Sequence, residues 1–273
     1  MPSSGNAPRV AVLVHNDATN DSRVLKESTS LREQGARVRI VAVERRLKGR
    51  TAGTSELAPG LDLHRVPEFA LERIAPALTR LTRRPAATAS SAAAAPPQVG
   101  RPSPLAAARR LGTRVAGDLG RRAYRTIELG TWWWRSARAA HAFAPEIVHA
   151  NDTNALVPAL AIQALGRREG RRVRLVYDSH ELWRHRNVEG RRLLAPLLDA
   201  AIEHVAIPRA DVVITVSPSI AEWLRRTYRL DRLPLVVRNV PVAGPLPDRG
   251  TGVLRERAGL PASDRVIAYG GRS

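Results

Sequence analysis

The sequence predicts an α/β fold, a Rossmann-like parallel sheet with helices on both faces. Five short runs of Val, Ile and Leu stop abruptly at polar residues, and helical patterns lie between them. Runs this apolar fit strands that are buried on both faces, which is typical of parallel sheets. The runs are Val10–Val14, Ile147-Val148, Leu175–Tyr177, Val212–Val216 and Leu235–Val237. Because open parallel sheets bind ligands beyond the carboxyl ends of their strands, the polar residues there predict a ligand site.

The N-terminal segment has the pattern of a βαβ unit. The strand at Val10–Val14 is followed by a polar loop and a helix, and Gly35 fits the left-handed position that ends such a helix. Val38–Val43 is the next strand, so the crossover between the two strands is expected to be right-handed. Leu61–Val66 predicts a weaker third strand.

The middle of the chain changes in composition. Residues 83–104 are mostly Ala, Pro, Ser and Thr without a periodic apolar face, which predicts a disordered insertion. Residues 105–143 are rich in Arg and Ala, and we expect four glycines to break them into several helices. Further helices are expected over residues 156–165, 190–206 and 218–228.

The chain is predicted to hold one full domain, residues 8–242, and a fragment of a second domain, residues 243–273. The first residues after this boundary are rich in Pro and Gly, as in a hinge. A short helix at Val253–Ala258 and a strand at Arg265–Tyr269 then lead to the glycine pair Gly270-Gly271.

Composition excludes several classes of protein. The chain has no Cys, so disulfides, thiolate metal sites and cysteine nucleophiles are excluded. It has no run of about 18 apolar residues and no signal-like N-terminus, which favours a cytoplasmic protein. The net charge of +19 permits nucleic acid, an anionic membrane surface or phosphorylated substrates as partners and selects none of them. A broadly basic, solvated surface is the alternative reading of this charge.

The loop after the first strand carries more polar chemistry than helix capping needs. It runs into a helix N-terminus, where free backbone N–H groups favour an anion. One polar residue among positions 20–22 is enough to cap that helix. The loop lacks the G-x-G-x-x-G fingerprint of dinucleotide sites. Its candidate substrate-binding residues are His15, Asp17, Asp21, Ser22 and Arg23.

The tetrapeptide Asp178-Ser179-His180-Glu181 places an acid, a hydroxyl and an imidazole at one strand end. A histidine can hold or pass a proton near neutral pH, and a neighbouring carboxylate would raise the pKa of His180. The alternative is a turn histidine that binds the backbone. His185 follows five positions after His180, about 140° around a helix. This is not the H-E-x-x-H spacing, so we predict no metalloprotease and no metal site.

Ser217 follows a predicted strand and precedes Pro218. A serine nucleophile would need a G-x-S-x-G elbow, which is not found here. A cap residue followed by proline at the first helical position is the better reading.

Trp132, Trp133 and Trp134 occupy three successive positions, so on a helix they cannot all face one core. One reading packs two of the rings and exposes the third. The other places them, with nearby arginines, at a membrane interface.

Five segments in order resemble the N-terminal domain of the family-4 retaining glycosyltransferases of the GT-B fold. The segments are Asp17–Glu27, His149–Asp152, Tyr177–Leu182, Ala210–Ser217 and Val237–Pro241. The resemblance covers most of residues 8–242, and residues 255–272 resemble the start of the family's second domain.

The resemblance implies the first half of a GT-B fold, in which two Rossmann-like domains face a cleft. The first domain holds a lipid or glycan acceptor, and the second holds a sugar linked to UDP or GDP, here for a hexosyltransferase. No metal and no further cofactor are implied. By the matching motif, His180 lies at the reaction centre as the catalytic residue. The implied substrate-binding residues are Asn151, Asp152, Asp178, Glu181, Ser217 and Asn239, and Gly270 and Gly271 are expected near the donor phosphates.

The family holds its donor with Arg, Lys and Glu residues of the second domain. We therefore expect residues 1–273 alone to transfer no sugar and to bind nucleotide sugars no tighter than about millimolar. The expected location is cytoplasmic, with peripheral attachment to the inner face of the membrane as a further option. The alternative function is a non-catalytic basic module that docks on an anionic membrane or nucleic acid. Nucleic acid is the weaker branch, because the arginines form no recognised binding motif.

Overall fold

The computed structural model describes residues 7–70, 104–182, 195–240, 253–261 and 263–266, and only the backbone of 104–122, 195–196 and 253–254. Contacts divide the chain into two units, residues 1–239 and 240–273. The second unit contains helix α8 (Val253–Ala258), as predicted. The other features described here belong to the first unit.

The first unit is built on a sheet of eight strands in the order β3-β4-β2-β1-β5-β6-β7-β8. All neighbours pair in parallel except β3 and β4, which are antiparallel. The strands are β1 (Arg9–Leu13), β2 (Arg37–Val43), β3 (Gly53–Ala58), β4 (Leu61–Val66), β5 (Ile147–Asn151), β6 (Arg174–Ser179), β7 (Val212–Thr215) and β8 (Leu235–Val236). The predicted parallel sheet is confirmed.

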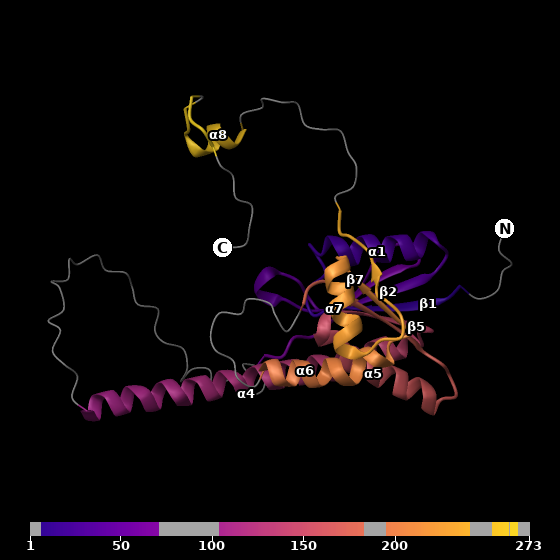
Figure 1. Ribbon diagram of the computed structural model, residues 1–273, viewed down its shortest axis with the longest axis horizontal. Helices are drawn as coiled ribbons and strands as arrows, with labels where there is room; N and C mark the ends of the chain where they lie inside the picture. The colour runs from indigo at the N-terminus through magenta and orange to yellow at the C-terminus, as the bar shows by residue number, and fades with distance from the viewer. Residues whose placement is uncertain (1–6, 71–103, 183–194, 241–252, 262, 267–273) are drawn as a thin grey trace. The chain divides into compact units, whose positions relative to one another are not determined.

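Helices cover both faces of this sheet, as predicted. Figure 1 shows α1 on one side of the strands and α4, α5 and α6 on the other. The α-helices of this unit are α1 (Ser22–Glu33), α4 (Pro104–Ala142), α5 (Asp152–Arg168), α6 (Ala195–Ala206) and α7 (Pro218–Tyr228). Two short 3₁₀ helices, η1 (Arg46–Lys48) and η3 (Ile207–Arg209), complete the described set.

The core has two parts, one on each face of the sheet. Val12 of β1 packs with Val24 of α1 in the smaller part. Its neighbour Leu13 packs with Leu156 of α5 in the larger part. Successive side chains of a strand point to opposite faces, so an unbroken apolar run is what a strand with two covered faces requires.

Helix α1 begins and ends at the predicted positions. Asp21 is its N-cap, with the side chain accepting a hydrogen bond from the backbone N–H of Val24. Gly35 follows it with φ +89°, a left-handed conformation that costs glycine little.

The prediction that glycines divide residues 105–143 into several helices was wrong. The segment lies in the single helix α4 of 39 residues, with Gly112, Gly117, Gly120 and Gly130 inside it. A glycine costs a helix about 1 kcal/mol but leaves the backbone N–H in place, unlike a proline. Burial of Trp132, Ala137 and Ala140 on the C-terminal half of α4 adds tertiary support.

Several boundaries differ from the predicted ones. Strand β5 continues to Asn151 and α5 begins at once with Asp152, so the polar residues lie on regular elements. The antiparallel edge strand β3 was not predicted, and its residues are mostly exposed. Arg265 and Val266 are not in a strand, and the remainder of that predicted strand lies outside the described residues.

The predicted disordered insertion, residues 83–104, also lies outside the described residues except for Pro104, where α4 begins. Among the helices that the structure describes, none combines the length and the apolar character needed to span a membrane.

Candidate functional site

The order of the strands reverses between β1 and β5. The chain leaves β1 toward β2 on one side and later returns to β5 on the other side. In open α/β sheets, ligands bind at the carboxyl ends of the strands at such a switch point. The amide of Asn151, at the end of β5, donates to the carbonyl of Leu13, at the end of β1 (3.2 Å). This bond joins the two strand ends on either side of the reversal.

Arg23 and Asp178 form the centre of the site. The guanidinium of Arg23, in the first turn of α1, donates from Nε to Asp178 Oδ2 (2.7 Å) and from Nη2 to Oδ1 (2.8 Å). Both residues are buried. The third guanidinium nitrogen of Arg23, Nη1, donates to the carbonyl of Val237 just after β8 (2.7 Å). One side chain therefore ties α1, β6 and the segment after β8 together.

His180 lies directly after β6 and is held through one ring nitrogen. Its Nε2 is 3.2 Å from Asp178 Oδ2 and 3.2 Å from the side-chain oxygen of Asn151. The other nitrogen, Nδ1, is 3.7 Å from the carboxylate of Asp152, beyond hydrogen-bond distance. The side chain is 21% exposed, so the ring is fixed and still reachable.

The charges of this cluster shift the pKa values of Asp178 and His180 in opposite directions. Burial alone would raise the pKa of Asp178, but the hydrogen bonds from His180 and Arg23 hold it well below its usual range. Burial likewise opposes protonation of His180, but the hydrogen bond to Asp178 and the charge of Asp152 outweigh it and raise the pKa of His180 above 6.5. The site is therefore built to hold a carboxylate and an imidazolium side by side.

Asp152 is the first residue of α5 and has φ +62°, a left-handed conformation that non-glycine residues seldom adopt. Burial raises the pKa of its carboxyl to about 6, although the charge of His180 opposes the shift. Backbone strain and a raised side-chain pKa at the same residue are typical of functional sites.

Glu27 and His149 belong to the same cluster and were not among the predicted site residues. Glu27 lies one turn after Arg23 on α1, and its Oε1 is 3.0 Å from Arg23 Nε. His149 lies on β5 two residues before Asn151, so both point to the face that α1 covers. The i, i+4 spacing from Arg23 on α1 and the i, i+2 spacing from Asn151 on β5 are sequence signals that could have found them.

Glu27, His149 and Asp178 form the one group of described residues whose spacing would suit a metal ion, with ligand atoms within 4.8 Å of one another. Asp178 Oδ2, however, already accepts hydrogen bonds from Arg23 and His180. The Arg23 guanidinium thus supplies the positive charge at this position, so the donor set does not favour a metal.

Two predicted residues of the first loop hold the loop itself. Asp21 caps α1 and accepts from the Asn16 amide (2.8 Å). The carboxylate of Asp17 accepts from the backbone N–H of Thr19 (2.9 Å), and this bond lowers the pKa of Asp17. Ser22 is exposed on the first turn of α1.

His15 packs against the other side of the switch point. Its ring lies 4.6 Å from that of Trp132 and its Nδ1 is 3.3 Å from the side-chain amide of Asn154. Burial lowers the pKa of His15 to about 4. His15 is therefore neutral at physiological pH, and the contacts described for its ring are with Trp132 and Asn154.

The remaining candidates divide between caps, surface and undescribed segments. Ser217 caps α7, with its hydroxyl accepting from the backbone N–H of Ile220 (3.3 Å). Asn239 accepts from Lys26 Nζ (3.4 Å) at the same end of the sheet as Arg23. Glu181 is exposed beside His180. Gly270 and Gly271 lie outside the described residues.

The three tryptophans follow the reading in which two rings are packed. Trp132 is buried, and Trp133 is partly buried and donates from Nε1 to the carbonyl of Asn154 (2.9 Å). Trp134 is exposed, and the guanidinium of Arg138 lies 4.9 Å from its ring centre.

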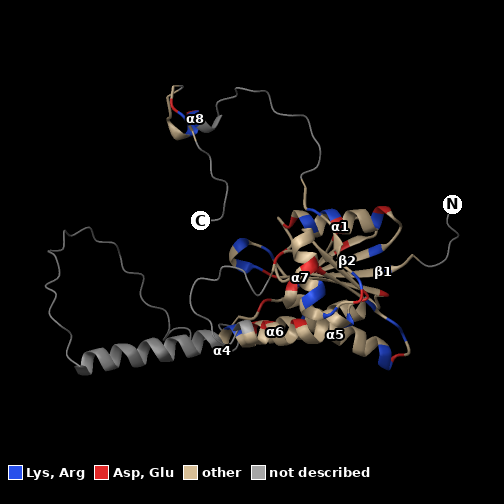
Figure 2. Cartoon of the chain, viewed as in Figure 1, with Lys and Arg blue, Asp and Glu red and all other residues tan. Residues whose placement is uncertain are grey.

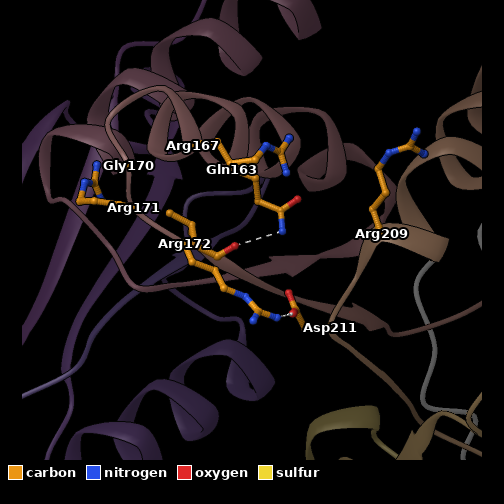
Figure 3. Close-up of a pocket in the computed structure, with 8 residues that line it drawn as sticks. Gln163, Arg167, Gly170, Arg171, Arg172, Arg209 and Asp211 are labelled. Carbon is orange, nitrogen blue, oxygen red and sulfur yellow. Dashed lines mark hydrogen bonds and ion pairs between the residues drawn. The ribbon is translucent and has the colours of Figure 1, made fainter.

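A pocket of about 600 Å³ lies at the opposite, amino-terminal end of β6 and β7. Its basic side chains do not converge: Arg172 pairs with Asp211, and Arg171 and Arg209 lie on opposite sides of the view in Figure 3. These arginines are therefore not arranged to bind one anionic ligand together. In the view of Figure 2, lysines and arginines occur on α1, near α7 and at the end of α5, so the basic charge is spread out.

Solved structures align with most of this chain at low sequence identity. No curated protein matches the chain. Among solved structures, sucrose-phosphate synthase from Thermosynechococcus elongatus is 12% identical with a TM-score of 0.46, and the match covers 92% of this chain and 95% of that one. UGT73P12 of Glycyrrhiza uralensis, complexed with glycyrrhetinic acid 3-O-monoglucuronide, is 8% identical with a TM-score of 0.35. The match covers 82% of this chain and 48% of that one.

The sequence model of the family described as Glycosyltransferase Family 4 matches residues 95–239. The matched segment begins after β4 and includes Asn151, Asp152, Asp178 and His180. It spans more than half of the 273 residues. The chain therefore belongs to Glycosyltransferase Family 4.

Proposed function

We propose that this protein transfers a sugar, of the hexosyl type, from a nucleotide-sugar donor to a lipid or glycan acceptor. Residues 8–242 form the acceptor side of the cleft in this proposal. The observation that carries it is the cluster of Arg23, Asp178 and His180 at the switch point of the sheet of a family-4 chain. Family membership favours this enzyme over a non-catalytic basic module.

The chemistry needs a group that can hold the reacting sugar. The bond between the anomeric carbon and the diphosphate oxygen breaks, and the diphosphate leaves with both electrons. The acceptor oxygen forms the new bond, and its proton passes to the departing diphosphate. His180 Nε2 is occupied by Asp178 and Asn151, so Nδ1 is the ring nitrogen that is left to contact a substrate hydroxyl in this proposal. Asp178 fixes the tautomer and orientation of the ring and stabilises its protonated form.

The donor side rests on the family resemblance. By this resemblance, a UDP- or GDP-linked sugar is the donor, a donor-binding domain starts near residue 243, and Gly270 and Gly271 are its candidate phosphate-binding residues. Retention of anomeric configuration and independence of metal are part of the proposal. The Arg23 guanidinium, which already neutralises Asp178, supports the second of these points.

Replacement of His180 tests the proposal. The chain is joined after Ser273 to a family-4 donor-binding domain, and the release of UDP or GDP and the glycosylated acceptor are both measured. His180→Ala should lower turnover by about two orders of magnitude, the scale of a lost acid–base or electrostatic group. His204→Ala, an exposed histidine on α6, is the matched control and should leave turnover unchanged. Normal turnover in a folded His180→Ala variant contradicts the assignment.

An anionic membrane surface is the partner that the exposed pair Trp134 and Arg138 supports. An aromatic ring and a guanidinium on one helix face suit the interface between headgroups and acyl chains. Trp134→Ala should weaken binding to vesicles that contain phosphatidylserine, and Leu57→Ala, an exposed apolar residue on β3, should not. Binding that ignores both anionic lipid and salt contradicts this partner.

A further inference from the structure

Two buried polar atoms lie close to Asp178, which forms a hydrogen bond with His180. His149 Nε2 on β5 and Glu27 Oε2 on α1 are 3.7 Å apart. Both atoms are shielded from solvent, and neither has a hydrogen-bond partner among the described residues. A buried polar atom left unpaired costs about 1–3 kcal/mol. One proton between the imidazole nitrogen and the carboxylate oxygen, with a small closure of the gap, satisfies both atoms at once.

A negative charge on Glu27, in addition to that on Asp178, is poorly accommodated here. Arg23 already forms a bidentate pair with Asp178, and its Nε is shared with Glu27 Oε1 at 3.0 Å. An ionised Glu27 would place two carboxylates on one guanidinium in a buried site, where like charges favour protonation of one of them. A metal is disfavoured as well, because Asp178 Oδ2 is already used by two donors.

We propose that Glu27 and His149 bind one proton between them at neutral pH, so that the Arg23 guanidinium is paired with Asp178 alone. Glu27 and His149 are positioning residues in this proposal, because they act on His180 through Asp178. Loss of the proton would add a negative charge to the cluster and favour the imidazolium form of His180. The inference rests on the proposed function only in the role that His180 has there.

Three charged or titratable groups face this pair. They are Arg23 on α1, Asp178 on β6 and His180 directly after β6. Burial and the charge of Asp178 raise the pKa of Glu27 to about 8, although Arg23 opposes the shift. Burial lowers the pKa of His149 to about 4. Both shifts favour the neutral forms, so the proton is on Glu27 and is directed at His149 Nε2.

Glu27→Gln is the sharpest test, because a glutamine is neutral and its NH₂ group can donate to His149 as the protonated acid does. We expect the NMR titration midpoint of the His180 imidazole to stay within about 0.3 unit of the wild-type value. If Glu27 were ionised, the substitution would remove a negative charge and lower that midpoint by about 1 unit or more, which would overturn the proposal. Glu33→Gln, an exposed glutamate on the same helix, is the matched control.

A direct titration of the wild-type chain keeps the test independent of any variant. The ¹³C signal of the Glu27 side-chain carboxyl should titrate above pH 7, and a midpoint near its ordinary value of 4.5 would overturn the proposal. A stoichiometric rise in melting temperature with ZnCl₂ that Glu27→Gln abolishes would also overturn it, in favour of a metal. No nucleotide sugar is present in these measurements, so their failure is separate from a failure of sugar transfer.

Discussion

Arg23 and Asp178 are separated by 155 positions in the chain and form a buried, bidentate ion pair. Because Asp178 also accepts from His180, the pair is the connection between α1 and the candidate catalytic histidine. The same guanidinium reaches the backbone after β8. The position of His180 therefore depends on how α1 packs on the sheet.

Removal of Arg23 should be strongly destabilising. Arg23→Ala leaves the Asp178 carboxylate buried without its partner, which costs about 3–5 kcal/mol of unfolding free energy. Arg23→Lys keeps the charge but loses the two-pronged geometry, so its loss should be intermediate. Urea unfolding measures both. Arg37→Ala, an exposed arginine on β2, should stay within about 0.5 kcal/mol of wild type. A loss under about 1 kcal/mol for Arg23→Ala would mean that the pair is solvated.

The titration of His180 should depend on Asp178. In the wild type its pKa is raised above 6.5, so it contributes stability that is present below the unfolded pKa and is lost as pH rises through the folded pKa. Asp178→Asn removes the charge that opposes burial, and the NMR midpoint of His180 should fall. His64, which contacts Thr54 on the edge of the sheet, is the internal control and should keep its midpoint. An unchanged His180 midpoint would remove Asp178 from the site.

Asp152→Asn should stabilise the fold while it impairs the proposed transfer. The pKa of Asp152 is raised from 3.8 to about 6, so the folded state binds its proton more tightly and wild-type stability falls as pH rises between these values. Asparagine lacks this titration and tolerates the left-handed backbone. Its gain over wild type should therefore grow from pH 4 to pH 7, by up to about 3 kcal/mol.

Urea unfolding at several pH values measures this gain, with Asp231→Asn, an exposed residue, as the control that should show no such trend. A gain for Asp152→Asn that shrinks with rising pH would contradict the raised pKa. A stability gain coupled to lost activity is the signature of a residue kept for function.

Two helical glycines should respond to alanine with opposite signs. A Cβ on Gly130 of α4 meets nothing within 4 Å, so Gly130→Ala should stabilise by about 0.5–1 kcal/mol. A Cβ on Gly166 of α5 would lie 2.6 Å from Val173 Cγ2 and 3.3 Å from the Arg171 carbonyl, so Gly166→Ala should destabilise. Thermal unfolding of the two variants side by side checks the prediction, and a gain for both would show that α5 can shift away from β6.

The candidate site was only partly predictable from the sequence. Polar residues at the ends of apolar runs pointed to Asp178 and His180, because strand ends in a parallel sheet share one edge. Asp21 and Ser217 also follow such runs, and both cap the N-termini of their own helices, as the cap reading of these positions predicts. A side chain that bonds its own helix and one that faces a ligand have the same local pattern, so only the contacts separate them.

The sequence by itself determined the parallel sheet and the start of α1, because strands covered on both faces leave unbroken apolar runs and helix caps leave polar residues at fixed offsets. It did not determine that α4 is one helix, since packing of its C-terminal half outweighs a small glycine cost. Nor did it show that Glu27 and His149 lie 3.7 Å apart behind Asp178. That contact joins α1 to β5 across the switch point, and a buried polar pair of this kind exists only once α1 has docked on the sheet.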